Sequence, residues 1–246
     1  MISARSLVAG VICVALFAGA AVAQERPIDR LNAFPSIFGA SSAYPSRSGS
    51  GSFGLTITDS RAGQDGPDAD AAASIWLGSA QDNLAVNLGI AFTGLDPFGD
   101  AGAFSVAVSR LVSVREQSAT YLGASMGNVE AWGTPGVEMT NNVYLSHIAF
   151  LFIGDRVYPV QVSVGSGSAT TRNTKTDAFE RGGFAGIGIG VWNNVSLSAS
   201  FTATQTNLGL STALPVGPGV GVTLGVADVA ENANDRQFSM SFGYGF

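Results

Sequence analysis

The amino-acid sequence predicts an all-β fold, an antiparallel up-and-down transmembrane barrel of about twelve strands. Three observations carry this prediction. Apolar residues recur at every second position from residue 53 onward, the alternate positions carry Gly, Ser, Ala, Thr and Asn, and short and long connections take turns along the chain. The chain of 246 residues is 46% hydrophobic, only 12% charged, and contains 32 Gly, a composition that excludes disorder.

The first 23 residues have the pattern of a secretory signal peptide. Arg5 gives a positive start, residues 7–22 are almost wholly apolar, and Ala21-Val22-Ala23 fits a small-residue cleavage site. We expect export and a mature chain that begins at Gln24. Cys13, the only cysteine, lies in this segment, so the mature chain would have neither disulfides nor thiol chemistry.

Residues 24–51 do not alternate and are expected to form an irregular N-terminal segment. Three prolines and the run Ser48-Gly-Ser-Gly51 interrupt any regular element. Two placements are open, a periplasmic tail and a plug folded into the lumen, and the tail is preferred.

Residues 52–246 contain the expected strands. The last strand shows the pattern best, because its apolar residues share one parity and Ser and Gly fill the other. The same alternation predicts strands at 53–58, 84–92, 103–108, 158–165, 185–191, 195–202, 220–226 and 237–246, with less regular ones at 72–79, 118–126, 142–152 and 206–212. This makes twelve strands, or ten if 72–79 or 206–212 do not form full strands.

The small, uncharged second face favours a closed membrane barrel over a soluble β-sandwich, which would expose a charged face to water. Connection lengths support the barrel, because outer-membrane barrels have short periplasmic turns and longer outer loops. Short turns are predicted at 80–82, 113–117, 153–156, 192–194 and 213–217, and longer links at 59–71, 93–101, 127–141, 166–182 and 227–235, with one tight exception near 204–206.

The C-terminal run from Phe238 to Phe246 resembles the terminal strand of Gram-negative outer-membrane barrel proteins. That resemblance implies that Phe238, Phe242, Tyr244 and Phe246 carry a signal read by the barrel assembly machinery, and that outer-membrane lipid surrounds the barrel. The stretch from Gly183 to Leu210 also resembles small bacterial barrel proteins without an assigned activity, and this second likeness supplies no functional residues.

Few residues suggest chemistry, and neither an enzymatic activity nor a cofactor is expected. His147, the only histidine, is expected to face inward, with Tyr144, Ile148, Phe150 and Phe152 facing lipid. A lipid-modifying barrel enzyme would need a Ser nucleophile beside this histidine. Ser146 is a poor partner because adjacent strand residues point to opposite faces.

The charged residues collect between the strands. Asp65, Asp68 and Asp70 lie in an acidic segment that is a weak candidate for Ca²⁺, although its spacing matches no EF-hand, and a solvated outer loop is preferred. The net charge of −6 argues against nucleic acid as a partner. The link at 166–182 is the candidate constriction loop, through Arg172, Lys175, Asp177, Glu180 and Arg181.

Gly186, Gly188 and Gly190 form a glycine run within a predicted strand, where no helix follows as a nucleotide-binding motif requires. Inward-facing glycines instead allow the wall to bend or a plug to approach. Together these features predict an outer-membrane protein that acts as a narrow passive channel for small solutes or as a structural envelope protein. The alternatives are a lipid-modifying barrel enzyme and a secreted soluble β-sandwich that binds a partner.

Overall fold

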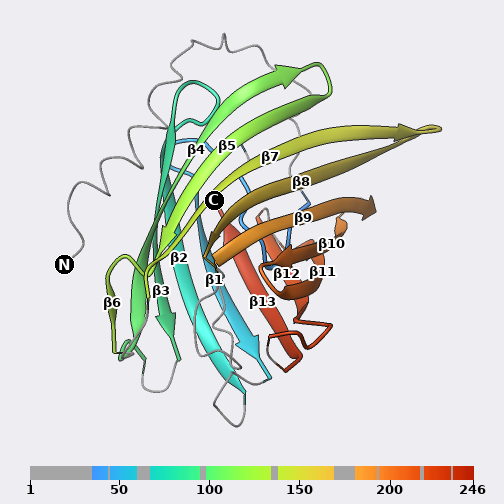
Figure 1. Ribbon diagram of the computed structural model, residues 1–246. Coiled ribbons are helices and arrows are strands. Elements are labelled where there is room, and N and C mark those ends of the chain that lie inside the picture. Colours follow the sequence, from blue (N-terminus) through green and yellow to red (C-terminus); the bar gives the residue numbers. More distant parts are fainter. Residues whose placement is uncertain are drawn as a thin grey trace.

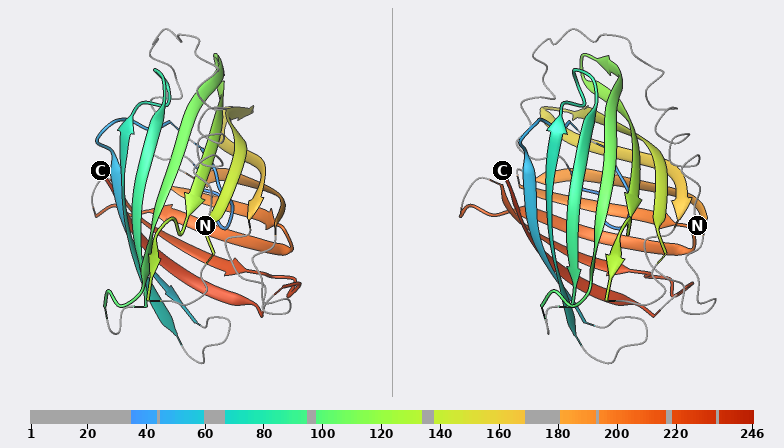
Figure 2. Two further views of the ribbon diagram at one scale, coloured as in Figure 1. Left: turned by 60° about the vertical axis from the view of Figure 1, so that its left-hand side comes forward. Right: turned by 90° about the vertical axis from the view of Figure 1, so that its left-hand side faces the viewer.

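Twelve antiparallel strands close into a barrel in the computed structural model (Figures 1 and 2). The structure describes residues 35–43, 45–59, 67–94, 98–133, 138–168, 181–192, 194–216, 219–233 and 235–246. Neighbouring barrel strands pair around the sheet, and β13 pairs with β1 to close it. Within the described ranges, no helix has the length and apolar character needed to cross a membrane.

The strands have the following bounds. They are β1 (Gly51–Thr58), β2 (Asp68–Gly78), β3 (Ala85–Thr93), β4 (Gly102–Arg115), β5 (Ser118–Gly127), β7 (Thr140–Ile153), β8 (Arg156–Ser168), β9 (Arg181–Trp192), β10 (Val195–Thr202), β11 (Gln205–Ala213), β12 (Val220–Ala227) and β13 (Gln237–Gly245). The two-residue β6 (Ala131–Trp132) is an addition outside the barrel wall, paired with the start of β4. The prediction of twelve strands is confirmed, and both doubtful segments, 72–79 and 206–212, belong to full strands.

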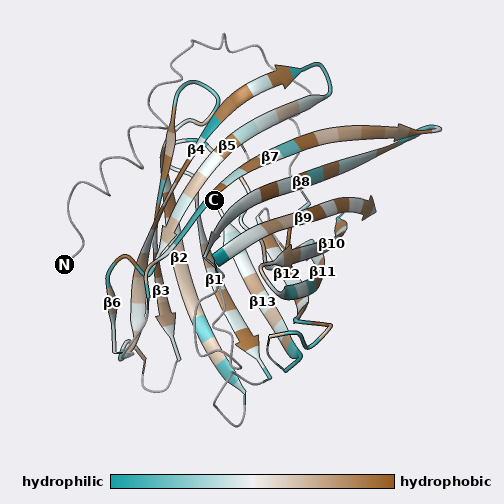
Figure 3. Ribbon diagram, in the orientation of Figure 1, coloured by the Kyte–Doolittle hydropathy of each residue, from teal (hydrophilic) through white to brown (hydrophobic). Residues whose placement is uncertain are grey.

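The alternation predicted from the sequence appears as two faces of the wall. Large apolar side chains such as Phe53, Leu88 and Leu224 are exposed on the outside, and every barrel strand except β5 contributes at least one exposed large apolar side chain. Figure 3 shows the resulting bands of hydrophobic and polar residues along each strand. The large apolar side chains are therefore not buried in a core between two sheets, as they would be in a soluble β-sandwich.

The connections between strands also alternate between short turns and longer links, as predicted. Strands β4 and β5, β7 and β8, and β9 and β10 are each separated by two residues at one end of the barrel. At the other end, the links β1–β2, β3–β4, β5–β7, β8–β9 and β12–β13 are longer, and the tight β10–β11 turn is the exception there. We refer to the end with the short turns as the periplasmic end, as this pattern indicates.

Strand β7 corrects the predicted side-chain orientation. Tyr144 and Ile148 are buried in the lumen, whereas His147 is exposed on the outward face with Val143 and Leu145. The expectation that Tyr144 and Ile148 face lipid and that His147 faces inward is therefore wrong. The physical reason is that β7 is apolar on both faces, because its inner face packs against other side chains within the barrel.

A small hydrophobic core fills one side of the lumen. It includes Leu111 on β4, Tyr121 on β5, Tyr144 and Ile148 on β7, and Phe184 on β9. The Tyr144 and Phe184 rings lie 6.2 Å apart between centroids. Glycines make room for these rings: a Cβ atom at Gly165 would lie 2.5 Å from the Phe184 ring, which is closer than real Cβ contacts allow.

Candidate pore and its N-terminal plug

The segment 35–43 lies inside the barrel, against the inner faces of β7 to β11 and against Gly225 of β12. We call this segment the plug, and it can be followed as the blue trace within the wall in Figure 2. Of the two placements considered for the N-terminal segment, the preferred periplasmic tail is wrong for these residues. Its Ala43 is fully covered, at 2% exposure, and belongs to the lumen core.

Side-chain hydroxyls of the wall hold the main chain of the plug. The N–H of Phe38 donates to Ser198 Oγ (3.1 Å), and Ser200 Oγ donates to the Phe38 carbonyl (2.6 Å). Ser163 Oγ donates to the Ser41 carbonyl at 2.7 Å. Because these bonds reach backbone atoms, they satisfy an irregular chain that has no strand partner of its own.

The end of the plug is held in the same way. The N–H of Ala43 donates to Ser146 Oγ (2.7 Å), and Gln161 Nε2 donates to the Ala43 carbonyl (3.2 Å). Both wall residues are buried, at 0% and 2% exposure. Buried polar side chains of this kind require such partners, so the inner face of β7 and β8 is matched to the presence of the plug.

Glycines in the wall accommodate the plug side chains. A Cβ at Gly209 would lie 2.6 Å from Phe38 Cβ, and one at Gly188 would lie 2.7 Å from the Ser36 carbonyl oxygen. Added Cβ atoms at Gly186 and Gly225 would collide with Ile37 and Phe38. The glycine run in β9 therefore serves close approach of the plug, one of the two uses expected from the sequence.

The segment then reaches the periplasmic rim and joins β1. The Ala80 N–H donates to the Ser46 carbonyl (3.3 Å), the Gly49 N–H donates to the Trp76 carbonyl (2.8 Å), and the Trp76 N–H donates to the Ser50 carbonyl (2.8 Å). The main chain that follows the plug is thus hydrogen-bonded to β2 and to the turn after β2.

The opposite side of the lumen holds a cavity of about 1610 Å³. Its described lining comes from the inner faces of β12, β13 and β1 to β4, which we call the open half. The periplasmic ends of β8, β9, β10 and β11 and Ser36 of the plug complete it. We call the inner faces of β7 to β11 the plugged half. Small residues dominate the lining of the cavity, among them Ser52, Gly54, Ser74, Gly243 and Ser241.

The charged groups near the cavity lie toward its ends. Arg156, beside the β7–β8 turn, is the one charged residue in the described lining. On β2, Asp68 and Asp70 belong to the inward parity near the outer end, and Asp70 accepts a hydrogen bond from the Gly94 N–H at 3.2 Å. Among the described residues there is no group of three His, Cys, Asp or Glu side chains that could hold a metal ion, and Asp65 lies outside those ranges.

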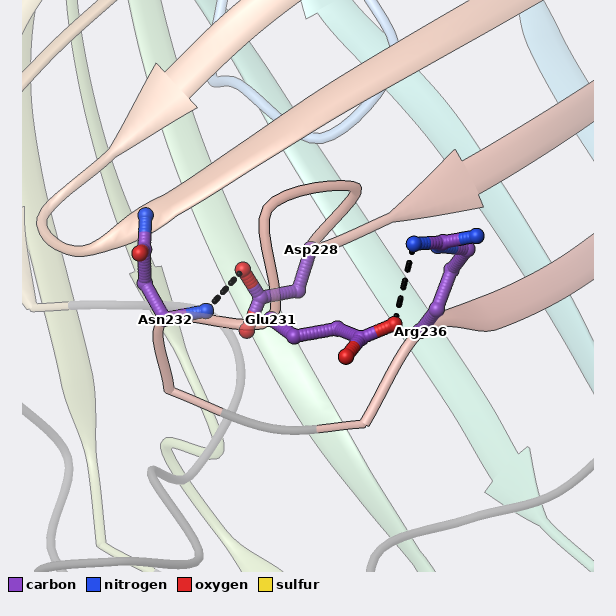
Figure 4. A network of polar contacts seen from close by, with 4 residues as sticks. All are labelled: Asp228, Glu231, Asn232 and Arg236. Carbon is purple, nitrogen blue, oxygen red and sulfur yellow. Dashed lines mark hydrogen bonds and ion pairs between the residues drawn. The ribbon is translucent and has the colours of Figure 1, made fainter.

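Asp228 organises the outer loop between β12 and β13, a role that the sequence analysis did not identify. Its carboxylate accepts hydrogen bonds from the N–H groups of Asn232 (3.0 Å) and Ala233 (2.8 Å), and its own N–H donates to Asn207 Oδ1. Arg236 pairs with Glu231 at 2.9 Å (Figure 4). Asn207 also contacts Gly39 of the plug, so this network connects the loop to the plug.

His147 lies on the outward face, away from the lumen. Its Nδ1 is 2.9 Å from Thr120 Oγ1. Ser146 points the other way and is fully buried against the plug. The Ser–His pair that a lipid hydrolase would need is therefore not formed by these neighbours.

The remaining candidate residues are only partly described. Arg172, Lys175, Asp177 and Glu180 of the candidate constriction loop lie outside the described residues, and Arg181 is an exposed residue at the start of β9. Phe238, Phe242, Tyr244 and Phe246, the candidate assembly signal, are all exposed on the outside. The Phe246 and Gly51 main chains exchange hydrogen bonds of 2.9 and 3.0 Å where the barrel closes.

Comparison with known proteins supports the class of fold. No protein-family model matches the chain, and no curated protein does. Among solved structures, the chain is similar to the KdgM porin, with a TM-score of 0.51, 10% identity, and coverage of 80% of this chain and 99% of that one. It is similar to an outer-membrane channel from Pseudomonas putida F1, with a TM-score of 0.50, 10% identity, and coverage of 84% and 99%.

A third similar structure is outer-membrane phospholipase A from Escherichia coli, with a TM-score of 0.49, 14% identity, and coverage of 82% of this chain and 91% of that one. The chain has a closed antiparallel barrel like those of the KdgM porin and the Pseudomonas putida F1 channel. This confirms the fold expected from the sequence.

Proposed function

We propose that the protein is a narrow passive channel of the outer membrane, exported through a cleaved signal peptide, and that it is not an enzyme. The observation that carries this proposal is the cavity of about 1610 Å³ beside the plug. A barrel of this size whose lumen was only structural could fill with side chains, as smaller barrels do. Here glycines, alanines and serines keep one half of the lumen empty.

The plug supports a narrow channel rather than a wide one. It occupies the space in front of β7 to β11 and leaves the route along the open half. The lipid-enzyme alternative has less support, because His147 is bonded to Thr120 and Ser146 is buried on the opposite face. The similarity in fold to two channels agrees with this proposal.

The test is conductance in planar bilayers with protein refolded in detergent. We expect discrete channels, and we expect Gly243→Trp to reduce their conductance, because this residue lines the open half and a Cβ there has only one neighbour, at 3.9 Å. Leu224→Trp is the matched control, because Leu224 is exposed on the lipid side and should leave conductance unchanged. A folded barrel without channel activity would contradict the proposal and favour the structural role in the envelope.

A further inference from the structure

Hydroxyl groups form a continuous row across the open half. Strand register places Ser211 beside Thr223, Thr223 beside Ser241, and Ser241 beside Thr56. The Oγ atoms of Ser211 and Thr223 lie 2.9 Å apart, and those of Thr56 and Ser241 lie 2.8 Å apart. The plug extends the row, because Ser36 Oγ lies 2.9 Å from Ser211 Oγ.

A second row, two residues nearer the periplasmic end of β1, has no polar side chain at all. It runs through Gly221, Gly243, Gly54, Ala72, Ala91 and Ala103, each the register partner of the next. Beyond it lies a third row that includes Ser52, Ser74 and Ser105, with Ser52 and Ser74 bonded at 3.0 Å. The cavity wall therefore alternates hydroxyl bands with a bare band.

The charges nearest these rows stand outside the middle of the cavity. Arg156 is the one charged side chain in its described lining. The hydroxyl row reaches Asp70, the register partner of Thr56, and then Thr93 on β3, and Asp68 lies two residues from Asp70 on the same inward parity. A solute would thus meet carboxylates at the outer end and neutral hydroxyls within.

We infer that the channel takes small uncharged hydroxylated solutes and disfavours anions, an inference that rests on the proposed channel function. Hydroxyls both donate and accept hydrogen bonds, so the two Ser/Thr bands can replace the water around a polyol or sugar. A charged solute loses hydration in the same passage, and within the described lining only Arg156, at the periplasmic end, offers an anion an opposite charge. The outer carboxylates add repulsion for anions.

The experiment measures tracer efflux from phosphatidylcholine vesicles that contain the refolded full-length chain. Glucose, gluconate and glucosamine serve as neutral, anionic and cationic solutes of similar size. We expect glucose to leave faster than gluconate by about fivefold or more, the scale set by one unfavourable unit charge. Equal rates for glucose and gluconate would overturn the inference while leaving a channel, whereas no efflux of any of the three would overturn the proposed channel function itself.

A substitution in the bare band sharpens the result. Gly54→Asp adds a charge where a Cβ meets only the Phe242 carbonyl oxygen at 3.7 Å, and Gly54→Asn adds the same shape without charge. The aspartate should slow gluconate and speed glucosamine, and the asparagine should leave the ratio of the two rates unchanged. Gly243→Asp, at its register partner, tests the same band if the first variant does not fold. A ratio shifted equally by both Gly54 variants would show that wall shape, not charge, selects the solute.

Discussion

The plugged half and the open half of the lumen are built from the same kinds of residue and differ in what they face. In the plugged half, Ser163 and Ser198 are almost fully buried, at 0% and 8% exposure, and bond to the main chain of the plug. In the open half, Ser52 and Ser74 bond only to each other among described residues and border the cavity. Small polar residues on an inner face thus suit a bound chain and a water-filled passage equally well.

The inward-facing apolar residues beside those serines differ between the plugged half and the open half. Tyr144, Ile148 and Phe184 point into the plugged half, where they meet Ala43 and one another. The bare band of the open half has only glycine and alanine at equivalent inward positions. Large inward side chains therefore mark the region of a barrel wall that binds a plug, and their absence marks the region that stays open.

Deletion of residues 35–43 should have the largest effect on this difference. Without the plug the lumen in front of β7 to β11 empties, and we expect single-channel conductance to rise by about twofold or more, since the free cross-section grows with the strands left uncovered. Bilayer recordings of the deletion variant beside the intact protein measure this.

The deletion also exposes the buried hydroxyls and the lumen core, so loss of the folded barrel must be separated from opening of the pore. Gel migration before and after heating reports whether the barrel has formed. A folded deletion variant with unchanged conductance would show that the plug does not border the solute path.

Two glycines to alanine offer a matched comparison of the halves. Gly209→Ala would place a Cβ 2.6 Å from Phe38 Cβ, whereas Gly243→Ala would place one 3.9 Å from its nearest neighbour. We expect the first to lower the free energy of unfolding by about 1–3 kcal/mol through overpacking. The second should change it by less than about 0.5 kcal/mol.

Urea titrations of both variants in detergent micelles measure the two values. If the added methyl group displaces the plug rather than β11, Gly209→Ala should also raise the single-channel conductance. Equal stability of the two variants would contradict the close contact between Phe38 and β11.

Much of the barrel could be predicted from the sequence, because side-chain alternation is local and a closed barrel turns one face of each strand outward. The strand count and the order of short and long connections followed from it. The orientation of β7 could not, because Tyr144, Ile148 and Phe150 are as apolar as the outward residues Val143 and Leu145.

The plug could be considered from the sequence but not placed. Its contacts pair residues that are more than a hundred positions apart, such as Phe38 with Ser200. The glycine run of β9 correctly predicted that another segment could pack closely against this strand. It did not indicate which segment of the chain that would be. The role of Asp228 was missed for a similar reason, since its partners form only when the outer loop folds back onto it.

A pair of serine-to-alanine changes gives the smallest effect and the most direct test of what the hydroxyls do. Ser163→Ala removes the donor to the Ser41 carbonyl and a neighbour of Ser146 Oγ, both within the buried interface of the plug. We expect the free energy of unfolding to fall by about 1–3 kcal/mol, the cost of leaving a buried polar group without its partner. Ser74→Ala removes a hydroxyl from the cavity wall, where water can replace it as the partner of Ser52, so stability should hardly change. Urea unfolding compares the two, and a Ser74 variant as destabilised as the Ser163 variant would mean that the open half is packed rather than wet.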